Sequence, residues 1–166
     1  MAQTAYLGLG SNQNDRLAQI RAAVESLDAH DRIEVVARSS VYETEPVGEI
    51  LDQPDFYNAV IAVETELPPR ELLDACKQIE RELGRTEGAP RHAPRPIDID
   101  LLIIEDIALS EDGLLIPHPE LANRRFVLAP LDELAPAVTL ADGRTPAQAL
   151  AGLGDGQRVR RVASLT

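Results

Sequence analysis

The segment PRHAPRPIDIDLLIIED, residues 90–106, constrains the fold of this chain more than any other. Its apolar residues, from Ile97 to Ile104, are typical of a buried central strand. Asp98 and Asp100 interrupt this run two positions apart, and two charges inside a buried strand are costly. A sequence that folds and still keeps both aspartates therefore indicates that they have a partner or a function.

Strand geometry places the two aspartates side by side. Residues two apart in a strand point to the same side, so Asp98 and Asp100 share one face, about 7 Å apart at their Cα atoms, with Ile97 and Ile99 on the other. Their charges repel, and a divalent cation would relieve the repulsion. Carboxylate oxygens suit Mg²⁺, which also binds phosphates, and two such ions could bridge the pair to a nucleotide. The spacing alone leaves open a simpler alternative, a solvated face of the sheet.

Cationic residues just before the strand favour the ligand interpretation. Positive side chains beside a metal-binding carboxylate pair suggest a polyphosphate ligand, because guanidinium groups pair with phosphate oxygens. These residues are Arg85, Arg91, His92 and Arg95.

Composition excludes several classes of function. The formal net charge of −12 argues against a nonspecific nucleic-acid binder. The chain has no apolar run of membrane-spanning length and no signal peptide pattern. Its single cysteine, Cys76, rules out an internal disulfide and fits a reducing compartment. We therefore expect a cytoplasmic monomer that acts on small molecules, without nucleic acid or membrane.

Periodicity predicts an α+β fold. The 166 residues suggest one domain, 1–166, whose end from about residue 152 has no clear pattern and could form a flexible tail. Strands are expected at 4–10, 32–44, 56–65 and 97–104, and helices at 14–30, 68–83, 126–135 and 145–152, with Asn14 as the first N-cap and Gly84 as a helix stop. The order β-α-β-β-α-β predicts a ferredoxin-like antiparallel sheet with helices on one face and a C-terminal extension. The other face would accept a ligand.

The segment RHAPRPIDIDLLI resembles the signature of the 6-hydroxymethyl-7,8-dihydropterin pyrophosphokinase family. Further blocks resemble the family in the same order: LGLGSN, VYETEPVG, DQPDFYNAV, IERELGR and IPHPELANRRFVLAPL. The resemblance covers about residues 4 to 140. It implies an Mg²⁺-dependent transfer of pyrophosphate from ATP to the pterin hydroxymethyl group, giving AMP, in folate biosynthesis.

The resemblance also implies the residues that do this work. Asp98 and Asp100 would bind two Mg²⁺ ions and, with Arg85 and Arg95, form the catalytic set. The pterin would be bound by Thr44, Glu45, Pro46, Val47, Phe56, Asn58 and Phe126. Without the resemblance, the simpler interpretation of the two phenylalanines is ordinary core packing.

ATP, as co-substrate, would contact a larger set. The matching positions are Lys77, Glu80, Arg85, Arg91, His92, Arg95, Ile99, Leu101, His118 and Arg124. Taken alone, His118 would be a hydrogen-bonded histidine in a turn, and Glu80 a solvated helix charge. The chain departs from the family at His92, Ala93, Glu87 and Lys77, so the behaviour of the loop before the aspartates is the least transferable feature.

Two other classes of function stay open from the residues alone. One is a ferredoxin-like regulatory module that binds a small ligand without chemistry. The other is a different Mg²⁺-dependent phosphoryl or nucleotidyl transferase, which the product nucleotide would distinguish. The sequence argues against a P-loop enzyme, because GLGSNQ lacks the later glycine and the Lys-Ser/Thr pair of that motif.

Overall fold

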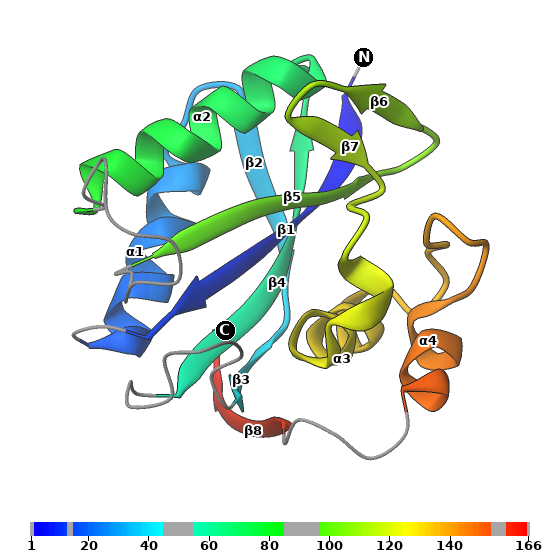
Figure 1. Ribbon diagram of the computed structural model, residues 1–166. Coiled ribbons are helices and arrows are strands. Elements are labelled where there is room, and N and C mark those ends of the chain that lie inside the picture. Colours follow the sequence, from blue (N-terminus) through cyan, green and yellow to red (C-terminus); the bar gives the residue numbers. More distant parts are fainter. Residues whose placement is uncertain (1, 13–14, 45–54, 85–96, 154–158, 166) are drawn as a thin grey trace.

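The computed structural model describes residues 2–12, 15–44, 55–84, 97–153 and 159–165 (Figure 1). The strands are β1 (Gln3–Ser11), β2 (Ile33–Arg38), β3 (Ser40–Thr44), β4 (Phe56–Thr65), β5 (Asp98–Ile104), β6 (Leu109–Glu111), β7 (Leu114–Ile116) and β8 (Val159–Ser164). The helices are α1 (Arg16–Asp28), α2 (Pro69–Glu82), α3 (Arg125–Leu134) and α4 (Pro146–Gly152), with a 3-10 turn η1 (Leu121–Asn123). Each strand and helix expected from the sequence is present.

The main sheet is antiparallel, with the strand order β5-β1-β4-β3-β8. Strand β2 also pairs with β4, next to the stretch of β4 that β3 occupies. Strands β6 and β7 form a separate hairpin. A mixed α/β fold with an antiparallel sheet is therefore confirmed, and β1 and β4 lie at its centre.

The strand expected over 32–44 is divided in two at Ser39. The backbone N–H of Ser39 donates to the Val60 carbonyl at 2.9 Å, and its hydroxyl oxygen accepts the Val60 N–H, also at 2.9 Å. The side chain thus replaces one rung of backbone pairing. The chain can bend there without leaving a buried polar group unpaired.

Helix α1 begins one residue later than expected. The N-cap is Asp15, whose carboxylate accepts the Ala18 N–H at 3.1 Å, so the prediction of Asn14 was wrong by one position. Helix α2 starts with Pro69, and Gly84 follows its end with φ of 105°, as its stop signal predicts. None of the described helices has the length and apolar character needed to cross a bilayer.

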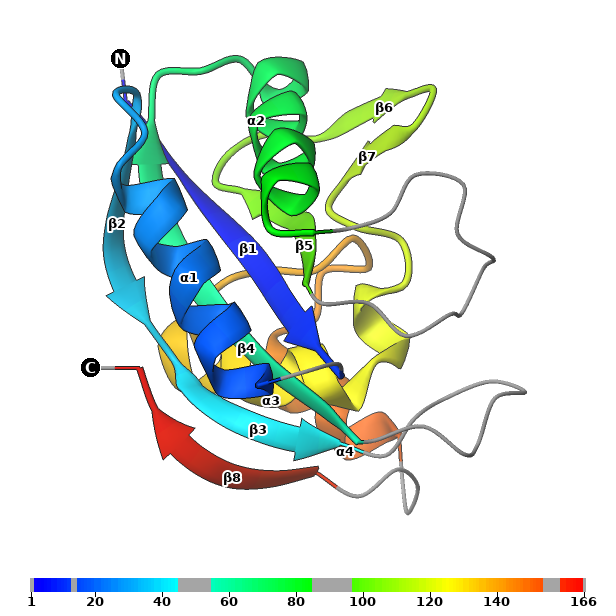
Figure 2. The same cartoon turned by 90° about the vertical axis from the view of Figure 1, so that its left-hand side faces the viewer.

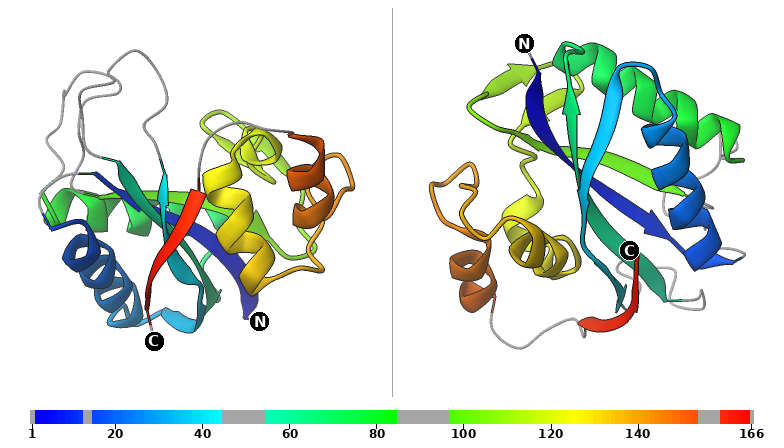
Figure 3. Two further views of the ribbon diagram at one scale, coloured as in Figure 1. Left: turned by 90° about the horizontal axis from the view of Figure 1, so that it is seen from below. Right: turned by 180° about the vertical axis from the view of Figure 1, so that it is seen from behind.

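Helices cover both faces of the sheet, which corrects the expectation of helices on one face only. Helices α1 and α2 pack on one face through a core that contains Ile20 and Leu72. Helices α3 and α4 pack on the other through a second core that contains Leu128 and Ala149. Figures 2 and 3 show the two layers. The segment expected to be an extension is thus a third layer over one end of the sheet.

Strand β5 contributes to both cores because helices cover both of its faces, and it also has an irregularity near its end. Its register with β1 shifts between Tyr6 and Leu7. Before the shift, Ile99 and Leu101 face the α2 side, and after it Ile103 faces the α3 side. The second half of the strand is apolar at every position because both of its faces are buried there.

Strand β8 lies within the segment that has no clear pattern in the sequence. It pairs along β3, and the figure shows it at the sheet edge in red (Figure 1). Arg161 lies 3.6 Å from the carboxylate of Glu133 on α3, and the Tyr42 hydroxyl donates to that carboxylate at 2.6 Å. The C-terminal strand is therefore attached to both the sheet and α3.

Candidate functional site

The two aspartates and the predicted pterin residue Asn58 face the same side of the sheet. Strand register pairs Asp98 with Gly10 and Gly10 with Asn58, while Asp100 pairs with Gly8. Directly paired residues point to the same face, so Asp98 and Asn58 stand in one row, two strand spacings or about 10 Å apart. Because Gly10 is the residue between them in this row, no side chain of β1 stands between Asp98 and Asn58.

Gly10 is required by the close approach of Asn58. A Cβ atom at Gly10 would lie 2.9 Å from the Asn58 side-chain oxygen, so any other residue there would force Asn58 to shift. The Asn58 amide nitrogen donates to the hydroxyl of Thr44 at 2.8 Å. Both side chains are buried, so the amide is held firmly in one orientation.

The two predicted aromatic residues lie near the ends of their elements. Phe56 is the first residue of β4 and pairs with Thr44. Phe126 is in the first turn of α3, with the Arg124 guanidinium 5.9 Å from its ring centre. Both are half-buried, and Phe126 packs against the second core, so each ring keeps some exposed surface.

The environment of Asp100 disfavours its charge. Burial, and then the neighbouring charge of Asp98, raise the pKa of Asp100 from 3.8 to about 6, although Lys77 and Arg124 oppose the rise. Like charges that are held close together behave in this way. The pair is thus an arrangement that a cation would stabilise.

Helix α2 fixes the backbone between the two aspartates. The Glu80 carboxylate accepts the Ile99 N–H at 2.6 Å, and the Lys77 ammonium donates to the Ile99 carbonyl at 3.3 Å. Glu80 and Lys77 also pair with each other at 3.3 Å. Because β5 is an edge strand, these side chains take the place of a neighbouring strand.

A cavity of about 580 Å³ lies along this edge, bordered by α2, β5 and the β6–β7 hairpin. Four predicted site residues line it: Lys77, Asp100, Leu101 and His118. Sequence reasoning missed the hairpin wall of this cavity, from Ser110 to Leu115, because three-residue strands give no periodic signal.

His118 connects this cavity to β5. Its backbone N–H donates to the Leu102 carbonyl at 2.8 Å, and its ring Nδ1 accepts the Glu120 N–H at 3.1 Å. Burial, and then Arg124, lower the pKa of His118, so the ring is neutral at pH 7. A neutral ring that accepts at Nδ1 carries its proton on Nε2, where it can donate to a ligand oxygen.

The remaining predicted residues fall into two groups. Ile99 is buried in the core beneath α2, as is most of Leu101, which also borders the edge cavity. Outside the described residues lie Glu45, Pro46, Val47, Arg85, Arg91, His92 and Arg95.

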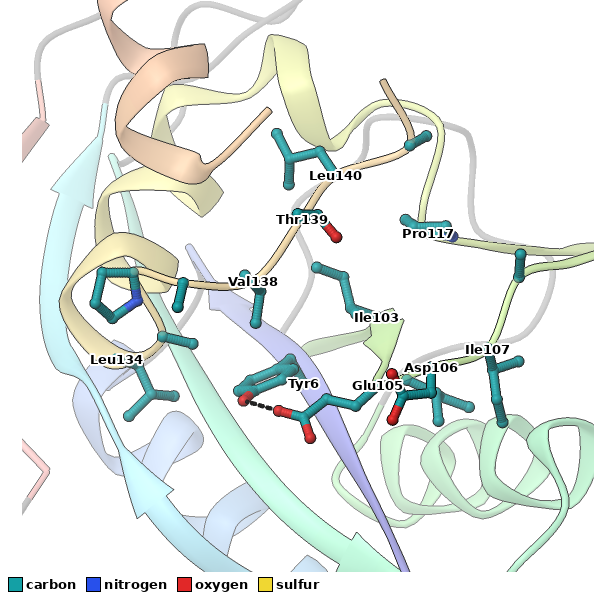
Figure 4. Close-up of a pocket in the computed structure, with 16 residues that line it drawn as sticks. Tyr6, Ile103, Glu105, Asp106, Ile107, Pro117, Leu134, Val138, Thr139 and Leu140 are labelled. Atoms are coloured by element: carbon teal, nitrogen blue, oxygen red, sulfur yellow. Dashed lines mark hydrogen bonds between the residues drawn. The ribbon is translucent and has the colours of Figure 1, made fainter. Parts of the chain in front are cut away.

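A second cavity, of about 640 Å³, lies at the other end of β1 (Figure 4). It is lined by residues such as Tyr6, Glu105 and Val138, and the Tyr6 hydroxyl donates to Glu105 at 2.9 Å. None of the described site residues lines it, so it is separate from the aspartate pair.

Comparison with known proteins shows the family. Residues 6–136 match 7,8-dihydro-6-hydroxymethylpterin-pyrophosphokinase, and the chain belongs to this family. A 2-amino-4-hydroxy-6-hydroxymethyldihydropteridine pyrophosphokinase of Methylorubrum extorquens is 47% identical over 158 residues, which are 95% of this chain and 98% of the relative. The Bacillus subtilis protein of the same name is 44% identical over 83% of this chain and 81% of its own length.

Solved structures show the same fold. The crystal structure of Plasmodium falciparum HPPK-DHPS with pteroate superposes with a TM-score of 0.71 at 16% identity. The match covers 92% of this chain and 42% of that one, so the present chain spans less than half of that larger protein.

Proposed function

We propose that this chain transfers the pyrophosphoryl group of ATP to the hydroxymethyl oxygen of 6-hydroxymethyl-7,8-dihydropterin, with AMP as the second product. We further propose that Asp98 and Asp100 hold the Mg²⁺ ions this reaction needs. Family membership supports the reaction. The row that joins Asp98, Gly10 and Asn58 supports the placement of the two ligands. In it, a carboxylate suited to Mg²⁺ lies on the same face as a fixed amide, which can hydrogen-bond to the polar edge of a pterin ring.

The aspartate pair fits magnesium chemically. Two carboxylates on one face offer hard oxygen ligands, and the remaining positions of the ion suit water and phosphate oxygens. The raised pKa of Asp100 indicates a site in which added positive charge is favourable. When bound, Mg²⁺ neutralises phosphate charge.

On the ATP side, we propose direct roles for the cations around the edge cavity. Arg124 acts on the pKa of both Asp100 and His118, so it lies close to both. It can pair with phosphate oxygens, while His118 donates from Nε2. Glu80 is only 1% exposed, so its contribution is to hold the Ile99 backbone. The predicted partners Arg85, Arg91, His92 and Arg95 would add charge from the preceding segment.

On the pterin side, Asn58 and Thr44 supply polar groups, and the rings of Phe56 and Phe126 supply stacking surface. The Asn58 amide nitrogen donates to the Thr44 hydroxyl oxygen, so the Thr44 hydroxyl can in turn donate a hydrogen bond to a ligand acceptor. Glu45, Pro46 and Val47 would complete this side. The attacking oxygen comes from the pterin, so the reaction needs no protein nucleophile.

Identification of the nucleotide product tests the proposal. ATP, Mg²⁺ and reduced hydroxymethylpterin are incubated with the protein, and nucleotides are separated by chromatography. AMP that forms only when the pterin is present supports pyrophosphate transfer. ADP would indicate another phosphotransferase, and pterin binding without turnover would indicate a binding module.

Substitutions test the aspartates. Asp98→Asn and Asp100→Asn should each lower kcat at least 100-fold while the circular dichroism spectrum is kept, because the loss of one carboxylate disrupts metal binding. The matched control is Asp106→Asn, two residues beyond the end of the same strand, where the residue is exposed and has a φ of 64° that asparagine also tolerates. Normal rates in either aspartate variant would remove the metal role.

A further inference from the structure

We propose that Arg16 is a positioning residue for the pterin, acting with Glu43 and Arg160 from the reverse face of the sheet. This inference rests on the pterin site proposed above. Arg16 is the first residue of α1 and belongs to none of the predicted site sets. Its partners are the residues that alternate with Thr44, Phe56 and Asn58 in the two strands.

Three contacts hold the Arg16 guanidinium. One nitrogen donates to the Asp55 carbonyl at 2.6 Å and lies 3.4 Å from the Glu43 carboxylate. The guanidinium carbon is 3.9 Å from the centre of the Tyr57 ring, the distance of a stacked cation–π pair. One side chain of α1 thus contacts both β3 and the start of β4.

The residues that Arg16 contacts are the immediate sequence neighbours of the proposed pterin-binding residues. Glu43 precedes Thr44, and Asp55 and Tyr57 flank Phe56. Glu43 and Tyr57 are register partners, as are Thr44 and Phe56. Adjacent strand residues point to opposite faces, so Arg16 binds the back of the strand pair whose front carries the ligand groups.

Glu43 extends the cluster to the C-terminal strand. Its second carboxylate oxygen accepts from Arg160 at 2.7 Å, and the two residues are register partners between β3 and β8. Strand β8 lies beyond residues 6–136, which match the family. A segment outside that match therefore contributes to the end of the sheet where the pterin binds.

The solvent exposure of the three side chains indicates how much each contributes to positioning. The Arg16 and Glu43 side chains are 25% and 19% exposed, whereas Arg160 is 69% exposed. Solvent screens an exposed ion pair strongly, so Arg160 contributes least. Arg16 also has the carbonyl and ring contacts, which added salt screens little. We therefore expect the effect on pterin affinity to be largest at Arg16 and smallest at Arg160.

Two separate dissociation constants test this assignment. The first is the dissociation constant of an ATP analogue, measured in the presence of Mg²⁺. This analogue has a methylene group between the α- and β-phosphates and cannot undergo the reaction. The other is that of 6-hydroxymethylpterin added to this complex. Arg16→Ala should weaken the pterin about tenfold and the analogue less than twofold, since the strand pair carries only pterin groups. Arg16→Lys, which keeps the charge and one donor, should recover part of the loss.

The other variants refine the assignment. Glu43→Gln should weaken the pterin about threefold, and Arg160→Ala about twofold at low salt and not at 0.5 M NaCl. The matched control is Arg144→Ala, which removes an exposed arginine paired with Asp142 and should change neither constant.

The outcomes separate this inference from the pterin site itself. If Asn58→Ala loses pterin affinity but Arg16→Ala does not, the positioning role is overturned and the site stands. If Arg16→Ala loses both ligands equally and melts at a lower temperature, its role is general stability and the inference is also overturned. If Asn58→Ala has no effect on pterin affinity, the proposed pterin site is itself misplaced.

Discussion

The Glu80 carboxylate accepts the backbone N–H of Ile99 at 2.6 Å, at the single residue that separates Asp98 from Asp100. A side chain from α2 thereby sets the position of the strand that carries the proposed metal ligands. Glu80 is 1% exposed, so water cannot readily replace it. Its effect on the aspartates acts through the backbone of β5.

Substitution of Glu80 should therefore lower both stability and turnover. Glu80→Ala leaves the Ile99 N–H without its acceptor, and we expect the free energy of unfolding to fall by about 1–3 kcal/mol. Glu80→Gln keeps an oxygen acceptor and should cost less, with a smaller loss of kcat. Urea unfolding and steady-state assays measure the two effects.

A nearby glutamate provides the control for this comparison. Glu82 lies on the same helix, is exposed, and accepts only from Gln78 among the hydrogen bonds described for it. Glu82→Ala should change the free energy of unfolding by less than about 0.5 kcal/mol. Equal losses in the Glu80 and Glu82 variants would show that removing any glutamate from α2, not the lost bond to Ile99, accounts for the effect, since alanine itself favours the helix.

Some features of the fold can be predicted from short stretches of the sequence, and others cannot. The apolar stripe that includes Ile20 and Leu27 predicted α1, and Gly84 marked the end of α2, because helix periodicity and stops depend on neighbouring residues. The layer on which α3 packs could not be obtained in this way, since an apolar stripe does not specify its partner. Strand β8 was missed because its exposed arginines interrupt the apolar pattern of an edge strand.

The same distinction holds for the site. The shared face of Asp98 and Asp100 followed from the two-residue period of a strand. Their alignment with Asn58 depends on the register of three strands that are distant in sequence, and only the structure provides it. Gly10 had a weak signal, the repeated small residue of GLG in a strand, but its contact with Asn58 could not be inferred from spacing.

The raised pKa of Asp100 predicts a pH-dependent cost to the fold in the absence of Mg²⁺. The folded protein keeps this proton up to a pH of about 6, whereas the unfolded chain releases it near 3.8. Between these values the unfolded state binds fewer protons, so this contribution to stability falls as pH rises and stays low above the window. Asp100→Asn should therefore stabilise the metal-free protein by roughly 3 kcal/mol at pH 7.5.

Urea unfolding at several pH values measures this gain. The difference between variant and wild type should shrink toward zero as the pH is lowered to about 4, and Asp106→Asn should show no such trend. A gain of the same size at every pH would mean that the raised pKa is not its cause.

Gly10→Ala should weaken pterin binding by displacing Asn58. The added methyl group would meet the Asn58 oxygen at 2.9 Å, and that side chain is already fixed by Thr44. We expect at least a tenfold loss of pterin affinity, about 1.4 kcal/mol. In the control Gly8→Ala, the methyl group would meet the end of the Leu102 side chain at 3.4 Å, and pterin affinity should be kept. Equal affinities in the two variants would contradict a role for the Gly10 contact.

His118 should be neutral, with its proton on Nε2, throughout the neutral pH range. Burial and the charge of Arg124 lower its pKa, and the Glu120 N–H occupies Nδ1. Long-range proton–nitrogen NMR should show the Nε2–H tautomer at pH 7, and Arg124→Ala should raise the pKa by removing one of its causes. The amide of His118→Gln can reach the Nε2 position, whereas the shorter amide of His118→Asn cannot. His118→Gln should therefore lose less affinity for the Mg²⁺-bound ATP analogue than His118→Asn. An Nδ1–H tautomer, or equal affinity in the two variants, would show that Nε2 does not donate to the nucleotide.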